Sequence, residues 1–227
     1  MNGCGNTPRR TATSVASVSR SSGGLRAPAV CILFLYPLKV GIVMKDFLPA
    51  VPANAPIFSQ AEMDALISAL SNKTKPTGVS TGSDKRTDES IRKTQGSHLE
   101  HNLFKDIYAK VTSASMAINE ATYRYDLTDI EPLQFLSYQD GGHYDWHLDI
   151  GRGAHSNRKL SLIIPLNDPS EYEGGELIVK AGRKDTVIPF KPGVPIYFPS
   201  MILHKVTPVT KGQRYVLVGW FRGPAFK

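Results

Sequence analysis

The sequence predicts a mainly β protein with flanking α-helices, in which the strands form an antiparallel barrel or jelly roll. From residue 121 onward, short β-rich runs alternate with turn-forming residues such as Gly141-Gly142 and Pro192-Gly193. Before that point, apolar residues recur at helical spacings of three and four in two stretches. Many short strands after helices are typical of a barrel or jelly roll with the helices packed outside it. The predicted strands are 121–127, 133–139, 143–149, 159–166, 175–181, 185–190, 194–198, 203–207 and 213–222.

Two helices are expected before the strands. Ser59 can cap the first helix, and Glu62, three residues later, completes a capping box. The apolar face of this helix consists of Met63, Leu66, Ile67 and Leu70. The second helix is predicted from about 98 to 120, with an apolar face of Leu103, Ile107, Val111, Ala114 and Ile118. The polar stretch 72–97 between the helices is expected to be a long loop or flap, and loops of that length are often functional.

The first 43 of the 227 residues differ in composition from the rest of the chain. They begin with a stretch rich in Ser, Thr, Gly and Arg, which can bury little apolar surface. The apolar run 27–38 that follows contains two prolines and is shorter than the about 20 residues of a membrane-spanning helix. We therefore expect 1–43 to be an unfolded or targeting-like extension, with a signal anchor as the other alternative.

The remainder of the chain, 44–227, is expected to be a single domain. Its predicted helical part is 57–120 and its predicted jelly-roll part is 121–227. The net charge of the chain is +7. The extension holds five basic and no acidic residues, whereas the body holds 22 basic and 20 acidic residues, a net charge of only +2. A nearly neutral body gives no argument for nucleic-acid binding.

The two cysteines of the chain, Cys4 and Cys31, both precede residue 44. The body therefore cannot contain a disulfide or use a thiolate as a nucleophile or metal ligand. Any metal site in the body must use histidines and carboxylates.

Three residues of the body have the arrangement of a metal site. His147 and Asp149 lie two apart on a predicted strand, so their side chains face the same side. His204 follows a later strand and can add a third ligand. Two histidines and one carboxylate on one face leave positions of the metal open, as in non-haem Fe(II) oxygenases. Against this interpretation, an isolated His-x-Asp is more often a loop pair, and His143 and Asp145 have the same spacing.

The residues around this pair resemble a known family. The run from Tyr138 to Asp149 has the pattern Y-x-x-G-x-x-Y-x-x-H-x-D of the prolyl 4-hydroxylase superfamily of 2-oxoglutarate/Fe(II)-dependent dioxygenases. Further runs are similar to that family's distal block and to its branch of PKHD-type hydroxylases. The resemblance extends over about 95–222 in the same order, and it selects the 147/149 pair over the 143/145 pair. The four matching runs are 138–149, 158–161, 168–177 and 204–215.

The resemblance implies a role for five residues. His147, Asp149 and His204 would be the iron ligands. Arg214, ten positions after the last of them, would bind the far carboxylate of 2-oxoglutarate, and Tyr138 would hydrogen-bond this cosubstrate. The forked guanidinium suits bidentate recognition of a carboxylate. An arginine on the otherwise apolar inward face of the strand 213–222 also needs an anionic partner.

Two of these roles have alternatives. Arg214 could instead pair with a structural acid such as Glu176. Tyr138 could be a core aromatic residue with a hydrogen-bonded hydroxyl. Several relatives carry a further tyrosine that assists in cosubstrate binding where this chain has Pro165, so we do not expect that contact here.

The resemblance implies a double-stranded β-helix (jelly-roll) core and a 2-oxoglutarate-dependent dioxygenase activity. The reaction would hydroxylate an unactivated carbon, in a prolyl or other residue of a protein substrate, with release of succinate and carbon dioxide. Its cofactors would be Fe(II) and 2-oxoglutarate, with ascorbate as a further candidate. The alternatives are a non-catalytic cupin-like module that binds a metal or a small acid, and a jelly roll with a purely structural role.

The composition and the resemblance also give expectations for the partners, assembly and location of the protein. A small molecule is the alternative to a protein substrate, nucleic acid is not expected as a partner, and a homodimer is a candidate assembly. We expect no transmembrane span. A cytoplasmic location is expected, with organelle targeting through 1–43 as the alternative.

Overall fold

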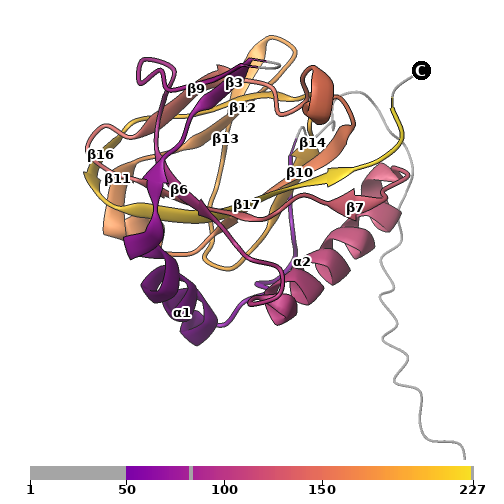
Figure 1. Cartoon of the computed structure of the whole chain (residues 1–227), viewed down its shortest axis with the longest axis horizontal. Coiled ribbons are helices and arrows are strands. Elements are labelled where there is room, and N and C mark those ends of the chain that lie inside the picture. The colour runs from indigo at the N-terminus through magenta and orange to yellow at the C-terminus, as the bar shows by residue number, and fades with distance from the viewer. Residues whose placement is uncertain (1–49, 82–83, 226–227) are drawn as a thin grey trace, which may run out of the picture. The chain divides into compact units, whose positions relative to one another are not determined.

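A computed structural model describes residues 50–81 and 84–225 (Figure 1). The predicted extension 1–43 lies outside the described residues, and the division of the chain at residue 44 stays a prediction. Within the described ranges, no helix is both long and apolar enough to cross a membrane.

The larger sheet has eight strands and is antiparallel throughout. Its order is β1 (Val51–Pro52), β14 (Ile196–Pro199), β10 (Arg158–Pro165), β17 (Arg214–Arg222), β8 (Gln134–Tyr138), β6 (Gln95–His98) and β2 (Lys75–Pro76), with β7 (Asp129–Ile130) also paired to β17.

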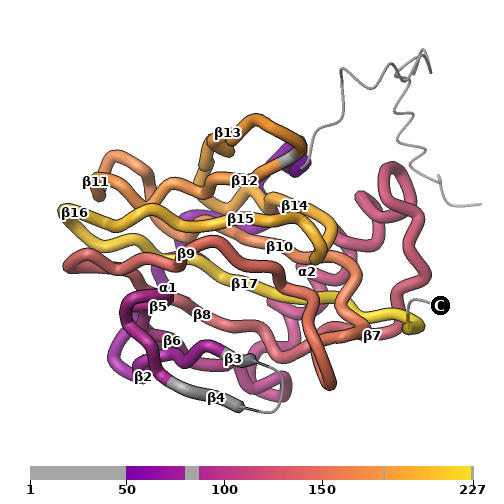
Figure 2. Tube along the Cα trace, turned by 90° about the horizontal axis from the view of Figure 1, so that it is seen from above, coloured from indigo at the N-terminus to yellow at the C-terminus, as the bar shows by residue number. Residues whose placement is uncertain are grey.

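The smaller sheet is also antiparallel and has five strands. Their order is β13 (Lys184–Ile188), β12 (Leu177–Ala181), β15 (Leu203–Val206), β9 (His143–His147) and β5 (Arg92–Lys93), so that β15 lies between β12 and β9 (Figure 2). Two further two-stranded sheets are separate from these. They pair β11 (Tyr172–Gly174) with β16 (Val209–Gly212) and β3 (Val79–Thr81) with β4 (Asp84–Arg86).

Apolar side chains from both sheets form one buried cluster. Strand β17 shows how alternation builds it: Val216 and Val218 belong to this cluster, whereas Leu217 and Phe221 belong to the cluster under the helices. Two antiparallel sheets that share an apolar interior are a jelly roll, and the predicted fold class is confirmed.

Both helices pack on the outer face of the larger sheet, below β17 in Figure 1. Helix α1 (Gln60–Leu70) begins as predicted, because the Ser59 hydroxyl accepts from the Glu62 amide and the Glu62 carboxylate accepts from the Ser59 amide. Helix α2 (Lys105–Ile118) is fixed by Tyr108, whose hydroxyl donates to Leu99 O and accepts from Leu133 N. These helices cover the sheet face that points away from the predicted site.

Three predictions about local structure are wrong. The second helix begins at Lys105 rather than at 98, because Gln95–His98 pairs with β8 as strand β6. Leu103 therefore lies outside the helix and is 78% exposed. The predicted strand 121–127 does not form: the π-helical turn Asn119–Tyr123 occupies its start, and the residues up to 127 are irregular. The Asn119 side chain holds the chain there, since it bonds both the amide and the carbonyl of Tyr125.

The polar stretch 72–97 is also more ordered than a loop, since it contains the strands β2 to β6 within its described residues. These strands are only two to four residues long. They carry no alternating apolar pattern, so the sequence offered no signal for them. Their backbone pairing with β8 and β9 places the stretch beside the predicted site.

Candidate active site

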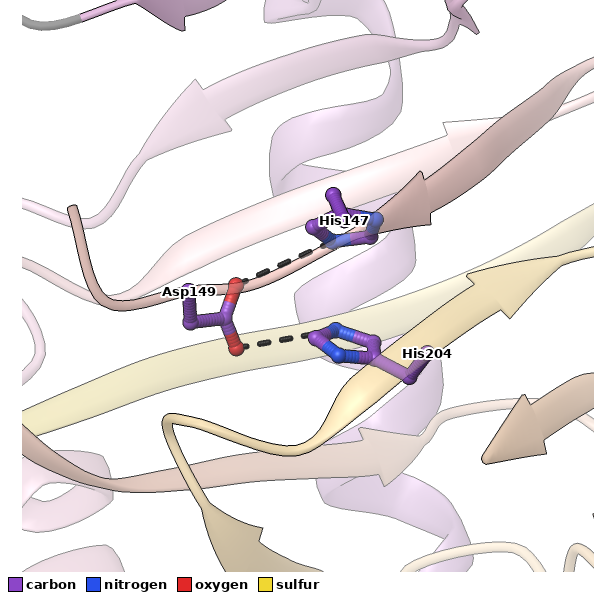
Figure 3. Close-up of side chains that lie close together, drawn as sticks. All are labelled: His147, Asp149 and His204. Atoms are coloured by element: carbon purple, nitrogen blue, oxygen red, sulfur yellow. Dashed lines mark ion pairs between the residues drawn. The ribbon is translucent and has the colours of Figure 1, made fainter. Parts of the chain in front are cut away.

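His147, Asp149 and His204 converge on one point (Figure 3). His147 ends β9 and is the direct cross-strand partner of His204 on β15, while Asp149 follows in the loop after β9. One ligand atom from each residue lies within 4.8 Å of the others. His147 Nε2 is 3.8 Å from Asp149 Oδ1, and His204 Nε2 is 3.6 Å from Asp149 Oδ2. The structure thus brings together the three residues that the sequence predicted as metal ligands.

Backbone carbonyls orient both imidazole rings. His147 Nδ1 lies 2.8 Å from the carbonyl of Asp145, and His204 Nδ1 lies 2.8 Å from the carbonyl of Ile202. A carbonyl oxygen can only accept, so each Nδ1 carries the proton and donates. Each Nε2 is then left with a free lone pair directed at the carboxylate, which is the arrangement of a metal-binding histidine.

The carboxylate of Asp149 is held by a buried serine. Ser161 Oγ donates to Asp149 Oδ2 at 2.6 Å and also contacts Ser200 Oγ at 3.0 Å. The Asp149 amide donates to Ser200 O at 3.0 Å, which ties the loop after β9 to the turn before β15. The sequence analysis missed Ser161. Ser161 pairs with Trp220 of β17, and no spacing in the sequence reports its contact with Asp149.

The pKa values favour the forms that bind a divalent metal. Burial and, after it, the neighbouring His204 lower the pKa of His147 to about 3, so His147 stays neutral. Burial alone would raise the pKa of Asp149, but His204, His147 and the Ser161 hydroxyl outweigh it and the pKa is lowered. A neutral His147 imidazole beside an ionised Asp149 carboxylate is a suitable pair of donors for Fe(II).

Aromatic contacts fix the same rings. Tyr144 stacks on His147 with ring centroids 3.4 Å apart, and Phe198 meets the His204 ring edge-on at 4.7 Å. Arg92 lies over the other side of this stack, 4.5 Å from the centre of the Tyr144 ring. These packed contacts preorganise the two imidazoles.

The competing pair points elsewhere. His143 Nδ1 donates to Gly141 O at 2.8 Å, and the exposed Asp145 carboxylate accepts from the Trp146 amide. Within the described part of the chain, neither residue belongs to the metal-ligating group.

Arg214 is a buried cation with an aromatic enclosure. Its side chain is 0% exposed and lies between the rings of Tyr138 and Phe190, 4.7 and 4.9 Å from their centres. All three guanidinium nitrogens are buried and lack a hydrogen-bond partner among the described residues. The alternative that Arg214 pairs with Glu176 is wrong, since Glu176 is exposed and Arg214 forms no ion pair within 50–81 and 84–225. Such a group requires an anion to compensate for its burial.

A cavity of about 340 Å³ adjoins the triad. Its wall includes Arg158, which forms a 2.6 Å ion pair with Glu131 and lies 4.0 Å over the ring of Trp220. A second cavity of about 470 Å³ adjoins it, since both are lined by Gly78, Arg92, His98, Gln134 and Leu136. The second cavity is also lined by Lys73, Lys75 and Glu100. Two adjoining cavities therefore lie beside the metal-ligating residues.

Comparison with protein families gives a match over the strands that carry this site. Residues 133–222 match the family model described as the 2OG-Fe(II) oxygenase superfamily. A PKHD-type hydroxylase from Synechococcus sp. (strain CC9605) is 43% identical over 81 residues, which are 35% of this chain and 36% of the relative. This chain therefore spans about a third of the length of that relative.

Two solved structures share the fold. The crystal structure of a Pseudomonas putida prolyl-4-hydroxylase has a TM-score of 0.62 and 22% identity, covering 78% of this chain and 94% of that chain. A prolyl hydroxylase from Trichoplax adhaerens, in complex with a hypoxia inducible factor oxygen degradation domain peptide fragment, has a TM-score of 0.64 and 16% identity. It covers 77% of this chain and 83% of that chain. These likenesses agree with the jelly-roll fold.

Proposed function

We propose that this chain is a 2-oxoglutarate- and Fe(II)-dependent hydroxylase of the 2OG-Fe(II) oxygenase superfamily, whose family model matches residues 133–222. The observation that carries the proposal is the combination of the His147, Asp149 and His204 cluster with a fully buried Arg214. A metal site alone would suit a binding module. A buried guanidinium with no anionic partner among the described residues calls in addition for an acidic ligand.

In this proposal each group of residues has one task. His147, Asp149 and His204 would hold the iron, and Arg214 with Tyr138 would hold 2-oxoglutarate. When bound, iron and 2-oxoglutarate would supply the oxidising chemistry: one atom of dioxygen would enter succinate, with loss of carbon dioxide, and the other would enter the hydroxyl group formed on an unactivated carbon of the substrate. Ascorbate is proposed as an auxiliary reductant that keeps the iron in the Fe(II) state.

The residues of the chain neutralise the charge of the cosubstrate, orient the metal ligands and exclude water from the site. The Arg214 guanidinium neutralises a carboxylate in an apolar enclosure, where an ionic hydrogen bond is stronger than in water. The Ser161 hydroxyl holds the Asp149 carboxylate in one orientation. The buried rings of Tyr138 and Phe198 limit the access of water to the site, which protects reactive species from side reactions.

We propose a protein as the substrate, oxidised at a prolyl or another residue. The two adjoining cavities, of about 340 and 470 Å³, together offer more room than a small metabolite requires, and an extended peptide could occupy both. The Trichoplax adhaerens relative was solved with a peptide fragment. Lys73, Lys75 and Arg92 outnumber Glu100 along the second cavity, which favours an acidic peptide segment there.

The remaining parts of the proposal concern the whole chain. We take residues 44–227 as one catalytic domain that acts in the cytoplasm, alone or as a homodimer. A chain that begins at Met44 should then retain the metal and 2-oxoglutarate affinities of the full chain. A loss of either affinity in the shortened chain would contradict this division.

The first experiment needs no substrate. Fe(II) and then 2-oxoglutarate are added to the protein without oxygen, and the weak visible charge-transfer band of the metal–cosubstrate complex is recorded. We expect a band in the wild type, no band in His204→Ala, and a much higher 2-oxoglutarate requirement in Arg214→Ala. Absence of a band in the metal-loaded wild type would reject the hydroxylase. A band without any succinate formation, when peptide libraries and oxygen are supplied, would favour a binding module of the cupin type.

A further inference from the structure

Tyr172 and Arg214 lie side by side, although they come from different strands. Tyr172 opens β11 and pairs with Gly212 of β16, two residues before Arg214 on β17. The Tyr172 side chain is 8% exposed and packs in the apolar cluster between the sheets. A Cβ atom added to Gly175 would lie 2.7 Å from Arg214 Cδ and 3.5 Å from Tyr172 Cε2. Both side chains therefore flank the same point of the backbone.

The Tyr172 side chain lies near Arg214, since both would contact a Cβ atom at Gly175. Burial raises the pKa of Tyr172, and the charge of Arg214, together with a hydrogen-bonding contact between the two side chains, opposes that rise. No nitrogen of Arg214 completes a hydrogen bond of standard geometry with any described residue. The phenol and the guanidinium are thus close, but the phenol does not satisfy the buried donors of Arg214.

We propose that Tyr172 donates its hydroxyl to the same carboxylate that Arg214 binds, and that the two residues together select 2-oxoglutarate by its far carboxylate. This inference rests on the proposed function, because the carboxylate belongs to the proposed cosubstrate. Arg214 supplies the charge and a planar fork of donors. A hydroxyl from a second direction fixes the rotation and depth of the bound group, which a fork alone leaves free.

The surroundings of the pair explain why a second donor matters. The rings of Tyr138 and Phe190 enclose the guanidinium on two sides. A carboxylate that enters this enclosure loses its water, and each of its oxygens needs a replacement donor. The number of donors around the far carboxylate should therefore control the affinity for a dicarboxylic oxo acid, and have no effect on a monocarboxylic one.

The test compares two oxo acids on two matched variants. 2-Oxoglutarate and pyruvate share the oxo-acid group that would chelate the metal, but only 2-oxoglutarate has a far carboxylate. Tyr172→Phe removes the proposed donor. Tyr197→Phe is the control, because Tyr197 is a buried tyrosine whose hydroxyl contacts Ser115 in the cluster under the helices. Both acids are titrated into the Fe(II)-loaded protein without oxygen, with the visible band as the readout and the melting temperature as a check of folding.

We expect Tyr172→Phe to raise the dissociation constant of 2-oxoglutarate about tenfold, which corresponds to about 1.4 kcal/mol. Its pyruvate and Fe(II) affinities should stay at the wild-type value, and Tyr197→Phe should change none of the three. Equal 2-oxoglutarate affinity in wild type and Tyr172→Phe would overturn the inference and leave the proposed function intact. Parallel weakening of both acids would also overturn it, since it would indicate general loosening of the site. A wild type that binds neither acid would reject the proposed function itself.

Discussion

The rings of Tyr144 and His147 stack face to face, with centroids 3.4 Å apart and planes inclined by 12°. The two residues are three apart on β9, where a regular strand would place them on opposite faces. The pairing of β9 with β15 shifts its register between them, since His204 pairs with His147 and Val206 pairs with Tyr144. An irregularity of the strand therefore brings a flat aromatic surface against a proposed metal ligand.

This stack gives a prediction about metal affinity. Tyr144→Ala should weaken Fe(II) binding about tenfold, because the His147 ring loses the surface that fixes its orientation. Tyr144→Phe keeps the ring and should bind Fe(II) like the wild type. Both values come from anaerobic metal titration. Equal affinity in the alanine variant would show that the Nδ1 bond to Asp145 O orients the ring without help from Tyr144.

The serine behind the carboxylate should matter in the same way. Ser161→Ala removes the 2.6 Å hydrogen bond to Asp149 Oδ2 in a fully buried position. We expect Fe(II) affinity to fall about 10- to 100-fold, the usual effect of losing a partner of a metal ligand. Ser156→Ala, at an exposed serine, is the control. Unchanged metal affinity in Ser161→Ala would show that the backbone contacts of Asp149 are enough to orient its carboxylate.

The sequence predicted the site better than it predicted the edges of the fold. The spacing of His147 and Asp149 reports which side of a strand each side chain faces, and it needs no knowledge of distant contacts. The apolar alternation of residues 213–222 placed Arg214 on the inner face for the same reason. The sequence Gln95–His98 has no such pattern. These residues form a strand because their backbone pairs with β8. Local sequence patterns therefore predicted the central strands of the jelly roll but not its edge strands.

Contacts between distant segments account for the functional residues that were missed. Tyr172 precedes Arg214 by 42 positions, and only the pairing of β11 with β16 brings them together. Ser161 meets Asp149 because β10 crosses behind the loop that follows β9. Neither contact has a spacing that a single sequence could reveal.

Arg214 should reduce the stability of the free protein. Its guanidinium is buried without an ion-pair partner among the described residues. The free energy lost by removing this charge from water exceeds the stabilisation from its contacts with two aromatic rings. Arg214→Met has a similar length and no charge, and we expect it to raise the free energy of unfolding by about 1–2 kcal/mol. The variant should also lose the rise in melting temperature that 2-oxoglutarate and Fe(II) give the wild type. A less stable variant that still responds to 2-oxoglutarate would contradict the role of Arg214.

Acid should destabilise the start of helix α1. The Glu62 carboxylate pairs with Lys110 and accepts from the Ser59 amide, and these contacts lower its pKa from 4.5 to about 2. A depressed pKa in the folded state gives stability that is present above pH 4.5 and lost as the pH falls from about 4.5 to 2. Glu62→Gln should flatten the pH dependence of the melting temperature over this interval. Glu120→Gln, at an exposed carboxyl after α2, should leave it unchanged.

Gly175, the residue after β11, sets the position of the Arg214 side chain. Gly175 has φ of 67°, and a Cβ atom there would lie 2.7 Å from Arg214 Cδ and 2.9 Å from Val209 Cγ2. Gly182 has φ of 70°, but a Cβ atom there would meet no heavy atom of the described residues within 4 Å. Gly175→Ala and Gly182→Ala should therefore share a backbone cost of about 1–2 kcal/mol, the penalty of a left-handed alanine.

Only Gly175→Ala should also displace Arg214 and weaken 2-oxoglutarate binding, because the added methyl group occupies space that Arg214 Cδ now fills. Titration of both variants with 2-oxoglutarate, beside their melting temperatures, separates backbone strain from displacement of the side chain. Similar losses of stability with a selective loss of 2-oxoglutarate affinity in Gly175→Ala would support this assignment. Equal 2-oxoglutarate affinity in the two variants would mean that Arg214 can shift by the width of a methyl group and still bind its ligand.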